Sequence, residues 1–175
     1  MTLRLILIRH AKSSWDDPFM DDHDRVLNER GQKSATAIGG WMEESGYLPD
    51  VILCSDAART VQTEARIVAK LAVAPALHTT GLLYHAAPDT ILDLVKKQTS
   101  RTIAVIGHNP GIGMLANGLV VLAPGHHRFS DYPTCATAVI DFAMQSWREV
   151  APNTGTCTDF VVPRDLIGTS KHDID

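Results

Sequence analysis

The chain has 175 residues, of which 45% are hydrophobic and 21% are charged, and its net charge is −4. This length suits one domain with a substantial core, so we expect residues 1–175 to form a single domain. The small negative charge and the lack of a Lys/Arg run argue against a nucleic-acid partner. No apolar run approaches the roughly 20 residues of a membrane span, so we expect no membrane association.

Cysteine usage and the start of the chain indicate a compartment. Cys54, Cys135 and Cys157 are widely spaced and form no CxxC pair, which favours neither a disulfide framework nor a structural zinc site. Free thiols suit a reducing environment. The first residues run directly into a strand-like segment, without the h-region and cleavage site of a signal peptide. We therefore expect a cytoplasmic protein.

The first predicted elements are a strand and a helix joined by a polar loop. The apolar run Leu3–Ile8 predicts a buried strand, and the Asp-rich stretch 12–25 predicts a loop. Asn28 is a candidate N-cap for the helix that follows. This helix should end near Ser45, because Gly46 is a natural stop.

The rest of the chain continues to alternate between strands and helices. Val51–Cys54 predicts a second buried strand, with Ser55 or Asp56 capping a helix to about Leu71. The later predictions are a short strand near Ala76–His78, a helix from Pro88 to about Lys97, a strand at Thr102–Ile106, a helix starting at Asn109-Pro110, strands at Ala136–Phe142 and Thr158–Val162, and irregular chain after Pro163. This alternation predicts an α/β fold with a mostly parallel sheet.

Residues suited to phosphoryl chemistry follow these predicted strands. Arg9-His10 and His108 each come directly after a buried strand, and Arg59 lies in the first turn of a helix after another. In open α/β sheets ligands bind beyond the carboxyl ends of the strands, so the four residues should converge. Arginine donates a planar fork to phosphate oxygens, and a neutral imidazole such as that of His10 can act as a nucleophile. His108, as an imidazolium, could hold a phosphate oxygen.

Four blocks of sequence, in order along nearly the whole chain, carry a resemblance to a known family. They are Leu7–Lys12, Leu27–Gly31, Cys54–Thr63 and Gly107–Gly111. They resemble the R-H-G/A, L-T/N-x-x-G, S-x-x-x-R-x-x-Q-T and G-H-N-P-G motifs of the histidine phosphatase superfamily. Within it, Arg9–Trp15, Tyr132–Thr134 and Pro163-Arg164 are similar to phosphohistidine phosphatases of the SixA type.

The resemblance implies a fold, a chemistry and roles for particular residues. The fold would be a three-layer αβα sandwich like that of phosphoglycerate mutase, and the activity a metal-independent phosphatase without a cofactor. His10 would form a transient phosphohistidine, while Arg9, Arg59 and His108 would bind the phosphoryl group. Arg25 has two interpretations that stay open: it reaches the pocket to bind substrate, or it is a surface partner of the neighbouring carboxylates Asp21, Asp22 and Asp24.

Two features bear on the substrate. The mutase branch carries a carboxylate general acid in mid-chain, but Leu82–His85 occupies that region here, which leaves His85 or Asp89 as candidates. A phosphohistidine leaving group makes such an acid dispensable. The short segment Leu77–Arg101 also leaves no room for an inserted lid, so the pocket should be shallow and open. We therefore predict a phosphohistidine phosphatase that acts on a phosphorylated protein, such as a phosphorelay histidine carrier domain.

Two other functions remain as alternatives. One is a small-molecule phosphomonoesterase or sugar-phosphate mutase of the same superfamily. The other is a non-catalytic phosphate-binding module, which is disfavoured because His10, His108 and both arginines are present. The pair His126-His127 could bind a metal, but such a loop pair is usually polar surface, and we expect no metal site.

Overall fold

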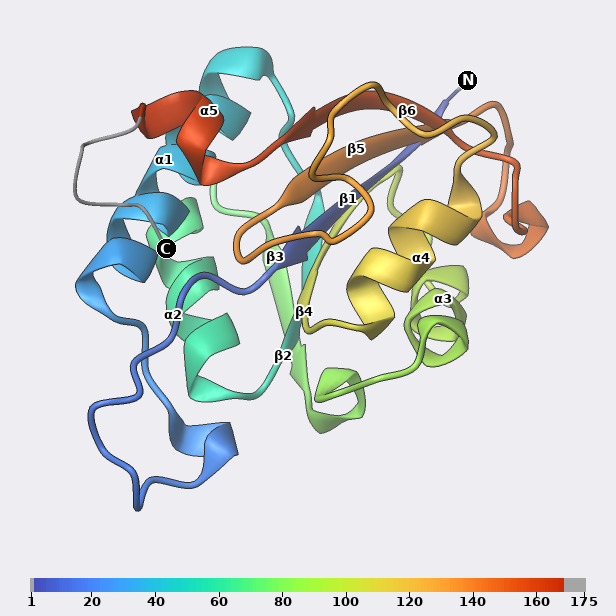
Figure 1. Cartoon of the computed structure of the whole chain (residues 1–175). Coiled ribbons are helices and arrows are strands. Elements are labelled where there is room, and N and C mark those ends of the chain that lie inside the picture. Colours follow the sequence, from blue (N-terminus) through green and yellow to red (C-terminus); the bar gives the residue numbers. More distant parts are fainter. Residues whose placement is uncertain (1, 169–175) are drawn as a thin grey trace.

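The structure, a computed structural model, describes residues 2–168. A six-stranded sheet with the order β3-β2-β4-β1-β5-β6 lies between two layers of helices (Figure 1). The strands β1 to β4 are parallel to one another, while β5 pairs with β1 and with β6 in antiparallel fashion. The strands are β1 (Leu3–Arg9), β2 (Val51–Ser55), β3 (Ala76–Thr80), β4 (Thr102–Gly107), β5 (Thr137–Phe142) and β6 (Thr156–Val161). The predicted α/β fold with a mostly parallel sheet is confirmed.

The helices form one layer on each face of the sheet (Figure 1). One layer contains α1 (Glu29–Ser45), α2 (Ala58–Val68) and α5 (Pro163–Ile167), and the other contains α3 (Pro88–Lys96) and α4 (Gly111–Leu119). Three short 3-10 turns complete the fold: η1 (Asp22–Asp24), η2 (Gly81–Leu83) and η3 (Trp147–Glu149). No helix within residues 2–168 has the length and apolar character needed to cross a membrane.

Each face of the sheet has its own core because successive strand residues point to opposite sides. In β1, Leu5 and Leu7 join the core under α3 and α4, whereas Ile6 and Ile8 join the core under α1 and α2. All four side chains are fully buried. Burial on both faces explains why this strand is a continuous apolar run and does not alternate with polar residues.

The ends of α1 agree with the prediction. The side chain of Asn28 accepts a hydrogen bond from the backbone N–H of Gly31 at 2.8 Å, and Gly46 adopts a left-handed conformation with φ of 72°. Both signals are local, since a capping side chain and a left-handed glycine act within one turn of the helix end.

Three predicted features are wrong. The N-cap of α2 is Ala57, not Ser55 or Asp56, because β2 runs on through Ser55; the helix also ends at Val68 instead of near Leu71. The chain after Pro163 is not irregular but forms α5, with the proline in the first turn, where its missing N–H costs nothing. The carboxylate of Asp165 accepts from the backbone N–H of Val162 at 2.8 Å and stabilises this start.

Two glycines allow the loops near the strand ends to pack closely. A Cβ on Gly31 would collide with the carbonyl of Lys12, two residues beyond His10. A Cβ on Gly111 would collide with the carbonyl of Ala86, so only glycine lets the segment around His85 approach the start of α4. These contacts bring the loops after β1, β3 and β4 to one edge of the sheet.

Candidate active site

His10 lies at the carboxyl end of β1 with its ring held in one orientation. Its backbone N–H donates to the carbonyl of Gly107 at 3.0 Å, which joins the ends of β1 and β4. Its Nδ1 lies 2.7 Å from the carbonyl of Ala11, which can only accept, so Nδ1 carries the proton and Nε2 presents its lone pair. The side chain is buried, and this burial, reinforced by the charges of Arg59, Arg9 and Arg25, lowers the pKa of His10 to about 3. His10 is therefore neutral near pH 7.

Arg59 links the groups of the site from the first turn of α2. Its Nε donates toward Nε2 of His10 at 3.3 Å, and its Nη1 donates to the backbone carbonyl of Asp22 at 2.6 Å. Its Nη2 lies 3.3 Å from both Nε2 of His85 and Nδ1 of His108. The residue is only 2% exposed, so its charge acts in a setting with little solvent screening.

His108 is neutral in this structure, contrary to the imidazolium that the sequence suggested. A guanidinium can only donate, so Nδ1 of His108 accepts from Arg59, and Nε2 donates to Oγ of Ser55 at 2.8 Å. Burial, together with the neighbouring His10 and Arg59, lowers the pKa of His108 to about 3. Its ring centroid lies 5.3 Å from that of His10, so the two imidazoles stand side by side.

The carboxylate of Asp22, from η1, lies between the guanidinium groups of Arg59 and Arg25 and contacts both. Oδ2 accepts from the hydroxyl of Tyr84 at 2.6 Å and from Nη2 of Arg59 at 3.0 Å, and it lies 3.2 Å from Nε2 of His85. The Tyr84 hydrogen bond, followed by the interactions with Arg59, holds the pKa of Asp22 well below its usual range. An oxyanion that binds Arg59 must therefore compete with this carboxylate.

The contacts of Arg25 are compatible with both interpretations drawn from the sequence. Its guanidinium is stacked on the ring of Trp15 at 3.5 Å, and its Nε lies 3.2 Å from Oδ1 of Asp22 in an ion pair. The residue is nevertheless 8% exposed, its charge acts on His10, and its buried Nη1 has no hydrogen-bond partner in the described chain. A buried N–H that lacks a partner is costly, so this group is a candidate contact for a substrate oxygen.

Arg9 borders the site from its other side. Its Nη1 donates to the carbonyl of Tyr132 at 3.1 Å, while its buried Nε has no hydrogen-bond partner among the described residues. Burial lowers the pKa of Arg9, and the charge of Arg59 adds to this effect, but the group remains a cation at neutral pH. Arg9 is thus a second arginine with an unused donor beside His10.

Of the two candidate general acids, His85 lies in the site, beside Arg59 and Asp22. Its Nε2 contacts Arg59 and Asp22, as given above, and its backbone has a φ of 50°, which is uncommon for a residue other than glycine. Such strained conformations gather at functional sites. Asp89 is exposed in the first turn of α3, and its carboxylate makes no ion pair within residues 2–168.

Sequence reasoning missed several contacts of the site. Asp22 was considered only as a surface partner of Arg25, Ser55 only as a helix cap, and Tyr84 was assigned no role. A signal for Tyr84 was present, because it stands beside His85 in the block where a general acid was sought. The run Asp21–Asp24 gave no signal that the carboxylate of Asp22 binds Arg59, since acidic runs are usually solvated.

Metal ligands do not cluster in the described part of the chain. Residues 2–168 contain no group of three or more His, Cys, Asp or Glu side chains placed to hold an ion. The rings of His126 and His127 are stacked with centroids 5.1 Å apart, and Nε2 of His126 lies 3.0 Å from a carboxylate oxygen of Asp165.

Comparisons with known proteins agree with this geometry. Residues 5–83 match the model of the histidine phosphatase superfamily, branch 1. An uncharacterized protein of Mycobacterium tuberculosis is 35% identical over 164 residues, covering 90% of this chain and all of that protein. A "putative phosphohistidine phosphatase SixA" from Agrobacterium tumefaciens has a TM-score of 0.77 and 29% identity, covering 92% of this chain and 98% of its own. A SixA structure solved with tungstate has the same TM-score of 0.77 at 20% identity, covering 94% and 99% of the two chains.

The chain belongs to the histidine phosphatase superfamily. Its fold is phosphoglycerate-mutase-like, and its structural neighbours include phosphohistidine phosphatases of the SixA type.

Proposed function

We propose that this protein is a phosphohistidine phosphatase, which removes phosphoryl groups from a protein histidine through a covalent intermediate on His10. The observation that carries the proposal is the state of His10: Nδ1 is held by the Ala11 carbonyl at 2.7 Å, and the neutral Nε2 faces the guanidinium of Arg59 at 3.3 Å. A lone pair directed at fixed cations is suited to attack on an anionic phosphorus centre.

The reaction has two displacement steps. Nε2 of His10 forms a P–N bond as the P–N bond of the substrate breaks, and a substrate ring protonated on its second nitrogen departs as neutral imidazole. Water then attacks phosphorus, both of its hydrogens leave with inorganic phosphate, and the bonding electron pair returns to Nε2. Nδ1 keeps its proton throughout, held by the Ala11 carbonyl. Neither step requires a general acid from the enzyme.

The arginines would supply the positive charge that the reaction needs. In Arg59, Nη1 donates to the backbone carbonyl of Asp22 and Nη2 donates to its carboxylate. A phosphoryl group can accept from the same two donors once Asp22 moves aside. The unpaired N–H groups of Arg9 and Arg25 would complete the set. Positively charged donors that are fixed in place before the reaction stabilise the transition state without reorganisation.

A protein substrate is supported by how little covers the site. Between β3 and β4 the chain forms only η2 and the nine-residue α3. The side chain of His85, which contacts Arg59, is 56% exposed. The similarity to the SixA-type relative supports the same substrate class. An open site forgoes the enclosure that helps to bind a small molecule, and it draws binding energy from a wider protein surface.

The experiment compares kcat/KM for a phosphohistidine-bearing carrier domain, a phosphoaspartate protein and a small aryl phosphate. We expect the phosphohistidine protein to be preferred by at least tenfold. Equal turnover of the small ester would overturn the protein-substrate proposal in favour of a general phosphomonoesterase. Phosphate binding without any turnover would instead support a non-catalytic module.

A further inference from the structure

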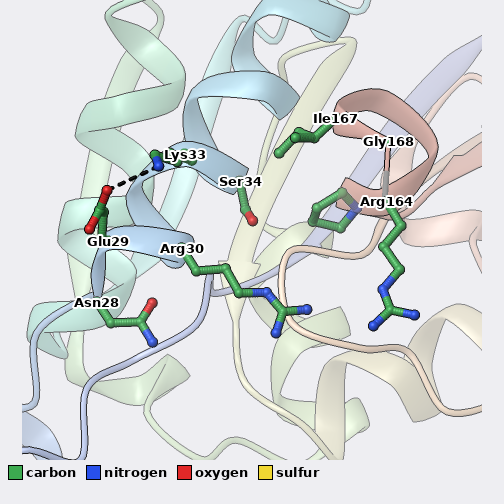
Figure 2. Close-up of a pocket in the computed structure, with 9 residues that line it drawn as sticks. Asn28, Glu29, Arg30, Lys33, Ser34, Arg164, Ile167 and Gly168 are labelled. Atoms are coloured by element: carbon green, nitrogen blue, oxygen red, sulfur yellow. Dashed lines mark ion pairs between the residues drawn. The ribbon is translucent and has the colours of Figure 1, made fainter. Parts of the chain in front are cut away.

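A basic groove runs away from the candidate active site along α1. It consists of two adjoining pockets of about 280 and 500 Å³ that share Arg30, Ser34, Pro163 and Arg164. The groove lies between the start of α1, the segment around Pro133 and α5, and we call it the α1–α5 groove. Figure 2 shows its outer part, where the guanidinium groups of Arg30 and Arg164 extend into the same space.

The lining of the α1–α5 groove is strongly cationic in a chain whose net charge is −4. The basic residues that line it within the described part of the chain are Arg9, Lys12, Arg30, Lys33, Arg128 and Arg164. Among residues 2–168, two carboxylates line it, and each is paired: Glu29 with Lys33 at 3.0 Å, and Asp131 with Arg128 at 2.9 Å. The excess positive charge is therefore local.

The α1–α5 groove adjoins the candidate active site at Arg9. Arg9 lines its inner end and precedes His10 in the chain, and Lys12 follows two residues later. The buried Nε of Arg9 has no hydrogen-bond partner within the described residues, so this end of the groove holds an unused donor. A ligand whose phosphorylated residue reached His10 would have its neighbouring residues over Arg9 and Arg30.

We propose that the α1–α5 groove binds an acidic segment of polypeptide that flanks the phosphorylated residue of the substrate. The position of that residue rests on the proposed function, whereas binding of the acidic segment does not. Aspartate and glutamate side chains along an extended segment match cations arranged in a row. A nucleic acid fits less well, because no aromatic side chain among residues 2–168 lines either pocket to stack on a base.

Binding is measured with a fluorescently labelled, unphosphorylated peptide rich in glutamate, using Arg30→Glu as the test variant. Arg30 is exposed in the first turn of α1, where a glutamate is compatible with the helix dipole, so the fold should be retained. Arg148→Glu is the matched control, since it makes the same charge change on η3, which packs against α3 in the other layer. We expect Arg30→Glu to weaken peptide binding by about tenfold, and Arg148→Glu to leave it unchanged.

Equal weakening by both variants, or no peptide binding by the wild type at low salt, would overturn the groove proposal. Tighter, Arg30-dependent binding of a single-stranded oligonucleotide of equal charge would also overturn it. Turnover provides a second test: Arg30→Glu should lower kcat/KM for an acidic phosphohistidine protein while a small aryl phosphate is hydrolysed as before. Failure of the proposed function looks different, because the wild type would then bind the acidic peptide but dephosphorylate no protein histidine.

Discussion

The carboxylate of Asp22 lies 3.0 Å from Nη2 of Arg59, across a sequence separation of 37 residues. The same guanidinium donates through Nε to Nε2 of His10. One arginine therefore holds both the proposed nucleophile and an internal anion. Because substrate phosphate would need the same donors, the affinity of the site for oxyanions depends on the release of Asp22.

Replacement of Asp22 by asparagine should strengthen oxyanion binding. The amide keeps the shape of the side chain but removes the charge that competes for Arg59, and a hydrogen bond to a charged group contributes about 1.5–3 kcal/mol. We expect inorganic phosphate or tungstate to inhibit Asp22→Asn at concentrations about tenfold lower than the wild type. Asp24→Asn, in the same 3-10 turn, is the control and should not change inhibition. Weaker inhibition of Asp22→Asn would show that the carboxylate supports the phosphate site.

Arg59→Lys should lose most activity although the charge is kept. A lysine cannot reproduce the donations from Nε, Nη1 and Nη2 that reach His10, Asp22 and His108. We expect kcat/KM to fall by the equivalent of about 2–4 kcal/mol, the range for a removed electrostatic donor. Arg66→Lys, an exposed position on the same helix, should remain near wild type. A similarly mild effect at Arg59 would place that residue outside the site.

The buried histidines should make the fold sensitive to acid. The pKa values of His10 and His108 are about 3 in the folded protein, compared with an ordinary value of 6.5. Between these pH values the unfolded chain binds more protons than the folded chain. The contribution of the two neutral histidines to the free energy of unfolding is therefore complete above pH 6.5, and it decreases as the pH drops toward 3.

Urea unfolding at pH 7.5 and pH 5 measures this effect. We expect the wild type to lose about 1–2 kcal/mol for each of the two histidines over that interval. His10→Asn should lose less than the wild type on acidification, whereas replacement of the exposed His78 should not alter the loss. An identical loss in His10→Asn would mean that His10 is not held neutral.

Activity should survive an excess of chelator. In the proposed mechanism, Arg9, Arg25 and Arg59 supply the positive charge for phosphoryl transfer, in place of the divalent ion used in many such sites. We expect the rate to be the same with and without a chelating agent after dialysis. A loss of activity that is reversed by one divalent metal would indicate a metal site that involves His85, His126 or His127.

The elements and the convergence of the site could be predicted because their signals are local or topological. Asn28 and Gly46 set the ends of α1 within one turn. The meeting of His10 and His108 follows from the position of both after adjacent parallel strands, whose ends share an edge of the sheet. Capping residues were sufficient for the first inference, and the order of strands and helices was sufficient for the second.

The remaining features depend on tertiary packing. Whether Asp22 faces solvent or Arg59 depends on the path of a loop without periodicity, so composition cannot decide it. The neutral state of His108 results from its burial at 3% exposure, which no neighbouring residue in the sequence reveals. The helix α5 has only five residues, too few for a helical pattern to be recognised.

Rapid-quench trapping of the intermediate tests the central claim most directly. The wild type is mixed with a phosphohistidine protein carrying radiolabelled phosphate, stopped within the first turnover, and analysed under alkaline and acidic conditions. We predict label on the wild-type chain that is stable to alkali and lost in acid, and no label on folded His10→Ala, whose turnover falls by several orders of magnitude. Undiminished turnover or equal labelling of His10→Ala would contradict the assignment of His10 as the nucleophile.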